Sequence, residues 1–169
     1  MARPAIPRAL HAEVPLVPPR QLIERLLVAG GLALSLAAAD MATKEYVPTP
    51  DVGLHPRSLT WAIVSVILIA AAVPLTRLPS WAVALSAGVM AGGTLGNLAS
   101  ALVWGGNVPN PILIGDYDDR GIAFNLADLF TFFGILALTV SLVVVTIRHR
   151  DRLLPPRAWE RRVWEKLGL

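Results

Sequence analysis

The sequence contains no cysteine, and only 16% of its 169 residues are charged. The absence of cysteine excludes disulfides and thiolate metal sites. Such a low content of charge is unusual for a soluble domain of this size. Hydrophobic residues make up 54% of the chain and are gathered into long blocks that carry no charge. The composition therefore favours a protein embedded in a membrane.

Four apolar blocks are long enough to cross a bilayer. Runs of about 17–25 apolar residues match the thickness of its hydrocarbon core, and helices satisfy every peptide group without water. The first block has a basic flank but no small-residue cleavage site behind it, which favours a retained helix over a signal peptide. We predict an all-α integral membrane protein with a four-transmembrane-helix bundle over residues 22–147. Its helices are expected at about 22–47, 59–76, 81–104 and 122–147, with a small irregular or hairpin element in the outer loop between the third and the fourth.

The basic residues lie mostly on one side of these helices. Twelve of the 15 Lys and Arg precede the first helix, occupy the turn between the second and third, or follow the fourth. Acidic residues gather on the other side: Asp40, Glu45, Asp51, Asp116, Asp118 and Asp119. The positive-inside rule therefore predicts a multi-pass protein with both termini in the cytoplasm.

The two chain ends are predicted to lie outside the bundle. Residues 1–21 are rich in proline and are expected to form a disordered cytoplasmic leader. Residues 148–169 form a basic cytoplasmic tail, in which 157–169 are either a helix lying on an anionic membrane surface or a solvated segment. Although the pI is near 10.0, this placement of charge does not favour a nucleic-acid partner.

Polar residues occur in pairs at the outer ends of three predicted helices. The pairs are Asp40 with Lys44, Asn97 with Ser100, and Asn125 with Asp128. Because the first and third helices run outward and the fourth returns, all three pairs reach the same depth. An ionisable residue in a membrane helix is costly and needs an explanation. We therefore predict one polar site near the outer interface.

Each pair also has a purely structural interpretation. Asp40 and Lys44 have the spacing of an ion pair within one helix. The glycines between 88 and 96 suit close helix packing. Asn125 has the character of a helix cap, with Asp128 stabilised by the helix N-terminus. Their coincidence at one depth is what favours a functional site.

Three segments resemble the motifs of lipoprotein signal peptidase (signal peptidase II). Residues 40–44 read Asp-Met-Ala-Thr-Lys, similar to that family's Asp-x-x-Ser/Thr-Lys. Residues 93–98 read Gly-Thr-Leu-Gly-Asn-Leu, similar to its Gly-x-x-Gly-Asn-Leu/Ile. Residues 124–128 read Phe-Asn-Leu-Ala-Asp, similar to its Phe-Asn-x-Ala-Asp, which is the most specific motif. The resemblance covers residues 22–147.

This resemblance implies an aspartic endopeptidase of the bacterial cytoplasmic (inner) membrane. Such an enzyme removes the signal peptide of prolipoproteins just before the diacylglyceryl-modified cysteine. It uses two aspartates, one as general base toward water and one as acid toward the leaving amine. Asp128 matches the second of these. Asp40, Lys44, Asn97, Ser100 and Asn125 would bind substrate or support the site. No metal or other cofactor is implied.

The sequence departs from the family pattern at important positions. Where the family has Asp-Arg at the end of the third helix, this chain has Ser100 and Ala101. Where the family has its first catalytic aspartate, this chain has Asn110 if one residue is inserted, or Pro109 if none is. Neither side chain acts as an acid or a base. Asp116, Asp118 or Asp119 of the same loop could substitute, and Asp116 is the preferred candidate because it follows an apolar stretch.

Two hypotheses for function remain open from sequence. The first is a divergent, active peptidase that uses Asp128 with Asp116 or a neighbour. The second is a catalytically degenerate member, a pseudoenzyme that binds or assembles other membrane helices or lipid. The expected partners are a prolipoprotein or other membrane helix and phospholipid. A small transporter subunit is a weaker third, because no predicted helix carries a midplane charge or break.

Overall fold

The computed structural model describes residues 17–115 and 121–149. Contacts group Leu16–Leu142 into one compact unit and assign the end of the last helix, from Val143 on, to another. The first unit contains all of the secondary structure except the last turns of the final helix. Most of the predicted leader and tail, including the proposed surface helix at 157–169, lies outside the described residues.

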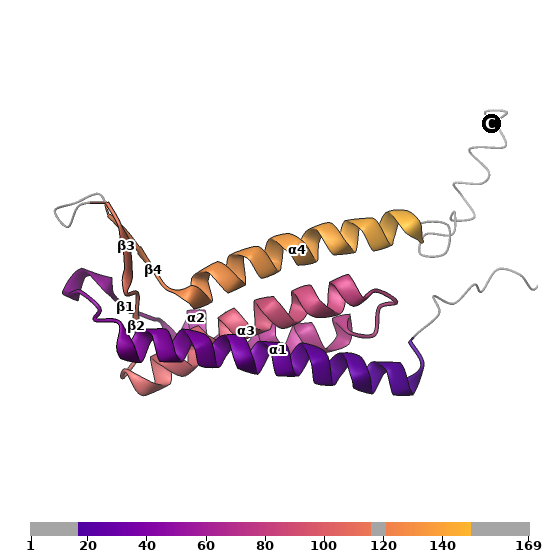
Figure 1. The fold of residues 1–169 in the computed structure, drawn as a ribbon, viewed down its shortest axis with the longest axis horizontal. Coiled ribbons are helices and arrows are strands. Elements are labelled where there is room, and N and C mark those ends of the chain that lie inside the picture. The colour runs from indigo at the N-terminus through magenta and orange to yellow at the C-terminus, as the bar shows by residue number, and fades with distance from the viewer. Residues whose placement is uncertain (1–16, 116–120, 150–169) are drawn as a thin grey trace, which may run out of the picture. The chain divides into compact units, whose positions relative to one another are not determined.

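Four helices are present in the described residues: α1 (Pro19–Tyr46), α2 (Leu59–Leu75), α3 (Trp81–Val103) and α4 (Leu126–Arg148) (Figure 1). By length and composition α1, α3 and α4 are able to cross a membrane, whereas α2, with 17 residues, is a shorter apolar helix. The chain is therefore a mostly helical membrane protein. Four crossings, and both termini in the cytoplasm, remain predictions.

Two of the predicted boundaries are wrong. Helix α1 begins at Pro19 rather than at residue 22, so residues 19–21 belong to the helix and not to the leader. Proline is well suited to the first turn, where its missing N–H has no helical partner. Helix α4 begins at Leu126 rather than at 122, because Ile122–Phe124 form a strand.

Four short strands lie at one end of the helices. Strand β1 (Leu54–Pro56), which follows the single 3₁₀ turn η2 (Asp51–Gly53), pairs with β2 (Asn107–Pro109), and β3 (Ile112–Ile114) pairs with β4 (Ile122–Phe124). Both pairs are antiparallel. Figure 1 shows them beyond the C-terminal end of α1. The β3–β4 pair is the small element expected between the third and fourth helices. The β1–β2 pair joins the segment after α1 to the segment after α3.

Helix α3 is the buried centre of the helical unit. Its glycines allow neighbouring backbones to approach closely: a methyl group on Gly88 or Gly92 would lie 2.8 Å from the carbonyl oxygen of Ala29 or Ala33 of α1. A methyl group on Gly93 would collide with the backbone of α4 at Ala127 and Thr131. The packing interpretation of these glycines is therefore correct.

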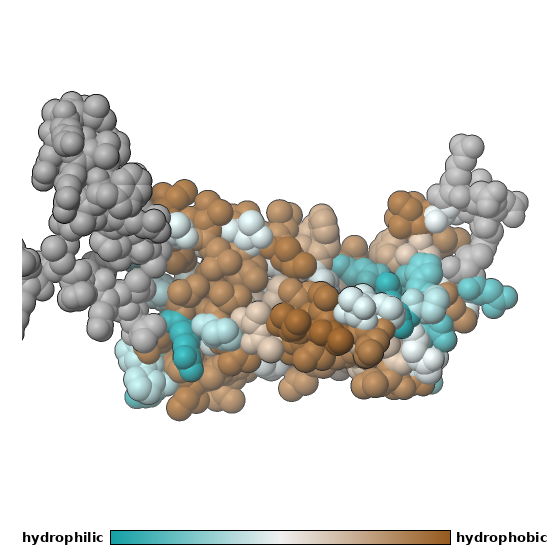
Figure 2. All heavy atoms as spheres, turned by 180° about the vertical axis from the view of Figure 1, so that it is seen from behind, coloured by the Kyte–Doolittle hydropathy of each residue, from teal (hydrophilic) through white to brown (hydrophobic). Residues whose placement is uncertain are grey.

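The outward faces of the helices are apolar. Large side chains such as Leu27 and Leu34 of α1, Ile67 of α2, and Phe132 and Leu136 of α4 are more than half exposed. Figure 2 shows hydrophobic residues over the helices on one face, and hydrophilic residues gathered near the strands. Exposed apolar surface of this extent is what a lipid-facing protein presents.

Candidate functional site

Asp40 and Lys44 form a buried ion pair near the C-terminal end of α1. Lys44 Nζ lies 2.6 Å from Asp40 Oδ2, and neither side chain has any exposed surface. The other carboxylate oxygen of Asp40 accepts the backbone N–H of Ala127 at 2.9 Å. Asp40 therefore holds the first turn of α4 in addition to its partner on α1.

Lys44 and Asn97 connect α1 to α3 and α4. In addition to Asp40, Lys44 Nζ donates to Asn97 Oδ1 at 2.9 Å and to Ser100 Oγ at 2.8 Å. All three hydrogens of its ammonium group are thus in use. Asn97 Nδ2 donates in turn to Asp128 Oδ1 at 2.8 Å. Asn97 is therefore the link between the ion pair and the acid on α4.

Asn125 and Asp128 cap α4 reciprocally. Asn125 Oδ1 accepts the N–H of Asp128 at 2.9 Å, and Asp128 Oδ2 accepts the N–H of Asn125 at 3.3 Å. This is a capping box, so the cap interpretation is correct. Because the cap uses the Asn125 oxygen, its amide nitrogen faces the other way, toward Asn97 Oδ1 at 3.0 Å and Asn110 Oδ1 at 2.6 Å.

Asn110 carries this hydrogen-bond chain into the strands. Its side chain is 1% exposed. Since its oxygen faces Asn125, its nitrogen donates to the carbonyl of Ala123 at 3.1 Å and to His55 Nδ1 at 2.8 Å. An amide nitrogen only donates, so His55 Nδ1 is an acceptor. The backbone N–H of Asn110 is also bound, to the carbonyl of Gly53 at 2.9 Å.

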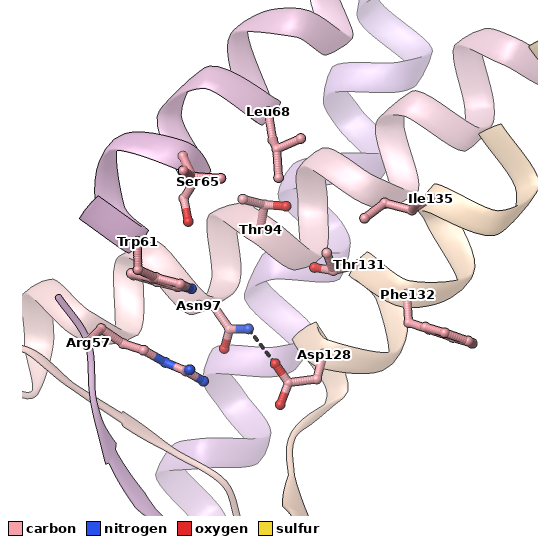
Figure 3. Close-up of a pocket in the computed structure, with 11 residues that line it drawn as sticks. Arg57, Trp61, Ser65, Leu68, Thr94, Asn97, Asp128, Thr131, Phe132 and Ile135 are labelled. Atoms are coloured by element: carbon pink, nitrogen blue, oxygen red, sulfur yellow. Dashed lines mark hydrogen bonds between the residues drawn. The ribbon is translucent and has the colours of Figure 1, made fainter. Parts of the chain in front are cut away.

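A cavity of about 360 Å³ borders Asp128 between α2, α3 and α4. Asn97, Asp128 and Arg57 line its polar end, and its apolar walls include Leu68 and Ile135. The guanidinium of Arg57 lies over the ring of Trp61, with its central carbon 5.3 Å from the ring centroid. Figure 3 shows the Arg57 side chain pointing toward the side of the cavity that carries Asp128.

The three pairs predicted from sequence do come together. Asp40, Lys44, Asn97, Ser100, Asn125 and Asp128 form one continuous hydrogen-bond network. Of the two candidates for the position of the missing aspartate, Asn110 places its side chain in this network, whereas Pro109 supplies only its carbonyl oxygen, to Asn125. The predicted substitute Asp116 lies outside the described residues, as do Asp118 and Asp119.

The family model for signal peptidase (SPase) II matches residues 50–144, more than half of the chain. The chain belongs to the signal peptidase II family. Its fold is similar to that of a bacterial membrane enzyme determined by the in meso method, with 18% sequence identity and a TM-score of 0.55 over 70% of this chain and 89% of the other. No curated protein is recognisably similar in sequence.

In this signal peptidase II family member, Ser100 stands where the family pattern has an acid. Its hydroxyl accepts from Lys44 and donates to the Gly96 carbonyl at 2.7 Å. Ser100 therefore satisfies the lysine without adding a second charge to the buried pair. Among the described residues, no group of three His, Asp or Glu is placed to hold a metal ion.

Sequence reasoning missed His55, Arg57 and Thr131. His55 is a single histidine in a short proline-rich segment, and nothing in the local pattern connects it to Asn110. Arg57 did give a signal, because it is a cation on the side of the membrane where acidic residues were predicted. Thr131 follows Asp128 by three residues, so it lies on the same face of α4.

Proposed function

We propose that this family member binds a hydrophobic membrane helix, such as the signal peptide of a prolipoprotein, at the Asp128 site without cleaving it. The observation that carries this proposal is the hydrogen bonding of the Asn110 side-chain amide. With a one-residue insertion, Asn110 takes the position where the resemblance places the first catalytic aspartate, and its side chain, unlike that of Pro109, joins the polar network. Both ends of that amide are bound, the oxygen by Asn125 and the nitrogen by Ala123 and His55. An amide is neither an acid nor a base near neutral pH, so Asn110 cannot activate a water or protonate a leaving group.

The other carboxylate of the network does not supply the missing acid. Asp40 has one oxygen on Lys44 and the other on the Ala127 N–H. Asp40 is also fully buried and does not line the cavity beside Asp128, so it is not available to a water in that cavity. Within the described residues, the network therefore contains a single carboxylate that is not ion-paired, Asp128.

What the site retains is suited to binding. The capping box and Asn97 fix the Asp128 side chain at the edge of the cavity. Exposed apolar faces of α2 and α4 lie beside it, including Val64 and Phe132. A membrane helix reaching this level would place its apolar residues against these faces and its polar end near Asp128.

An active peptidase is the second candidate, and the retention of Asp128 is the observation that favours it. Asp128 is held by hydrogen bonds yet borders a cavity large enough for water and a peptide bond. In that case Asp116, or alternatively Asp118 or Asp119, would be its partner.

The deciding experiment offers a diacylglyceryl-modified prolipoprotein to the purified protein and measures binding and cleavage together. We expect capture of intact prolipoprotein with no product by mass spectrometry, while an active family member cleaves the same preparation. Cleavage that disappears in Asp128→Asn would instead establish the peptidase, and Asp116→Asn would then test its partner. Absence of both binding and cleavage would contradict both functions.

The Asn110→Asp variant tests directly whether the amide at position 110 prevents cleavage. If the amide alone separates this chain from an active enzyme, the variant gains cleavage that Asp128→Asn abolishes. Asn107→Asp is the matched control, because Asn107 is an asparagine of the same loop whose amide donates only to the nearby Trp104 carbonyl.

We also propose the inner membrane as the location, with both termini in the cytoplasm. The support is the basic character of the two chain ends and the acidic character of the opposite loops. Reporter fusions at each terminus test this orientation, and a reporter active outside the cytoplasm at either end would contradict it.

A further inference from the structure

The cavity beside Asp128 contains polar atoms that the hydrogen-bond network does not use. Arg57 Nε and Thr131 Oγ1 are both buried and have no hydrogen-bond partner. Both residues line the same cavity, Arg57 ahead of α2 and Thr131 on α4 (Figure 3). Buried polar groups are rarely left without partners in native proteins. Two of them in one cavity indicate a ligand that accepts hydrogen bonds.

The polar end of this cavity carries two charges of opposite sign. Arg57 and Asp128 both line it, and neither belongs to an ion pair of the described residues, which are Arg20–Glu24 and Lys44–Asp40. Asp128 accepts one hydrogen bond at each oxygen, and a carboxylate has room for about four. Both groups therefore have capacity left for a ligand between them.

A ligand that complements this arrangement carries a negative charge near Arg57 and a positive charge near Asp128. Its anionic group would accept hydrogen bonds from Arg57 and Thr131, because a guanidinium matches phosphate oxygens well. Its cationic group would donate to Asp128. A neutral peptide offers carbonyl oxygens and N–H groups but no such pair of charges, so the two charges indicate a second, zwitterionic ligand in addition to the proposed helix.

The rest of the cavity indicates that the zwitterion is attached to apolar chains. Leu68 and Ile135 form apolar walls beyond the polar end. Val64, Phe132 and Ile135, which also line the cavity, are 49%, 63% and 42% exposed. The cavity is thus continuous with the apolar faces of α2 and α4. A molecule whose head occupies the polar end can extend its tails along these faces.

We propose that this cavity binds a zwitterionic phospholipid with a primary ammonium, of the phosphoethanolamine type. The phosphate lies at Arg57 and Thr131, the ammonium at Asp128, and the acyl chains lie between α2 and α4. The lipid would use the same cavity as the helix of the proposed function, so the two would bind in turn. The proposal goes beyond that function because it requires neither a prolipoprotein nor cleavage.

The experiment titrates delipidated protein with phosphatidylethanolamine, phosphatidylcholine and phosphatidylglycerol, and counts bound lipid by native mass spectrometry. We expect phosphatidylethanolamine to bind at least about tenfold more tightly than the other two, the loss of a charge-assisted hydrogen bond corresponding to roughly this factor. Phosphatidylcholine has the same charges but no N–H to donate, and phosphatidylglycerol has no cation. Equal binding of all three lipids would overturn the proposal.

Two variants locate the two charges of the lipid. Arg57→Gln should weaken phosphatidylethanolamine binding about tenfold, with Arg57→Lys intermediate. Asp128→Asn should abolish the preference over phosphatidylglycerol while some binding remains. Arg77→Gln is the matched control, because Arg77 is an exposed arginine in the turn between α2 and α3. If Arg57→Gln and Arg77→Gln behave alike, the site is not at Arg57.

A thermal unfolding curve of each variant shows that it is folded before its binding is interpreted. The result is also separable from the proposed function. Selective lipid binding without prolipoprotein capture would support the lipid site and contradict the proposed function. Prolipoprotein capture without lipid selectivity would support the proposed function and contradict the lipid site.

Discussion

The two halves of the polar network differ in how completely their groups are used. On the α1 side, Asp40 and Lys44 are fully buried and every hydrogen of the lysine has an acceptor. On the α4 side, Asp128 borders a cavity in which Arg57 Nε and Thr131 Oγ1 have no partner. Asn97 bonds to both halves. The comparison teaches that residues from one set of motifs serve two purposes: a closed half that holds three helices together, and an open half that is available to a ligand.

The largest expected effect comes from breaking the closed half. Lys44→Met leaves the Asp40 carboxylate buried without its cation, and we expect a loss of about 3–5 kcal/mol in the free energy of unfolding. Unfolding in detergent by added SDS measures it. Arg20→Met is the control, because the Arg20–Glu24 pair is largely exposed and should give no measurable change. Equal losses in the two variants would mean that the buried ion pair contributes no more to the unfolding free energy than the exposed pair.

The next largest effect is expected at the junction of the two halves. Asn125→Ala removes the cap of α4 and leaves the buried Asn110 oxygen without its donor, so we expect a loss of about 3 kcal/mol. Ser58→Ala is the comparison, because Ser58 caps α2 by one bond to the Trp61 N–H at 3.2 Å and lies outside the network. Its loss should be about 1 kcal/mol. If the two variants unfold alike, Asn125 acts only as a cap.

A smaller loss is expected from crowding the ion pair. A methyl group on Gly96 would lie 2.8 Å from Asp40 Oδ2, so Gly96→Ala should cost about 2 kcal/mol. On α1, a methyl group on Gly30 would meet nothing within 4 Å. Gly30→Ala should therefore stabilise the helix by up to about 1 kcal/mol. The two unfolding curves should shift in opposite directions, and a shared direction would contradict this packing.

The smallest effect on stability is expected in the open half. Arg57→Gln removes a cation over Trp61 and a nitrogen that has no partner, so the unfolding free energy should change by less than about 1 kcal/mol. Its effect should appear in lipid binding instead. A loss as large as that of Lys44→Met would show that Arg57 belongs to the closed half.

Much of this arrangement could be predicted from the sequence, because hydrophobic runs and helix direction together place the ends of three helices at one depth. The start of α4 could not, since Ile122–Phe124 are as apolar as the helix that follows. The contact between His55 and Asn110 could not either. It depends on the pairing of β1 with β2, strands of three residues that are more than 50 positions apart in the chain and too short to show an alternating pattern.

The chain of amides from Asp128 to His55 also has a fixed direction. The backbone N–H of Asp128 orients Asn125, Asn125 orients Asn110, and Asn110 presents a donor to His55 Nδ1. Amide groups pass on orientation but do not carry protons, so this chain is not a proton relay and His55 cannot serve through it as a base for Asp128. The tautomer of His55 with its hydrogen on Nδ1 would instead face an N–H of Asn110, and it would fit only if both amides turned over against the cap of α4. The tautomer of a histidine in a short strand is thereby tied to the cap of a helix in the membrane protein.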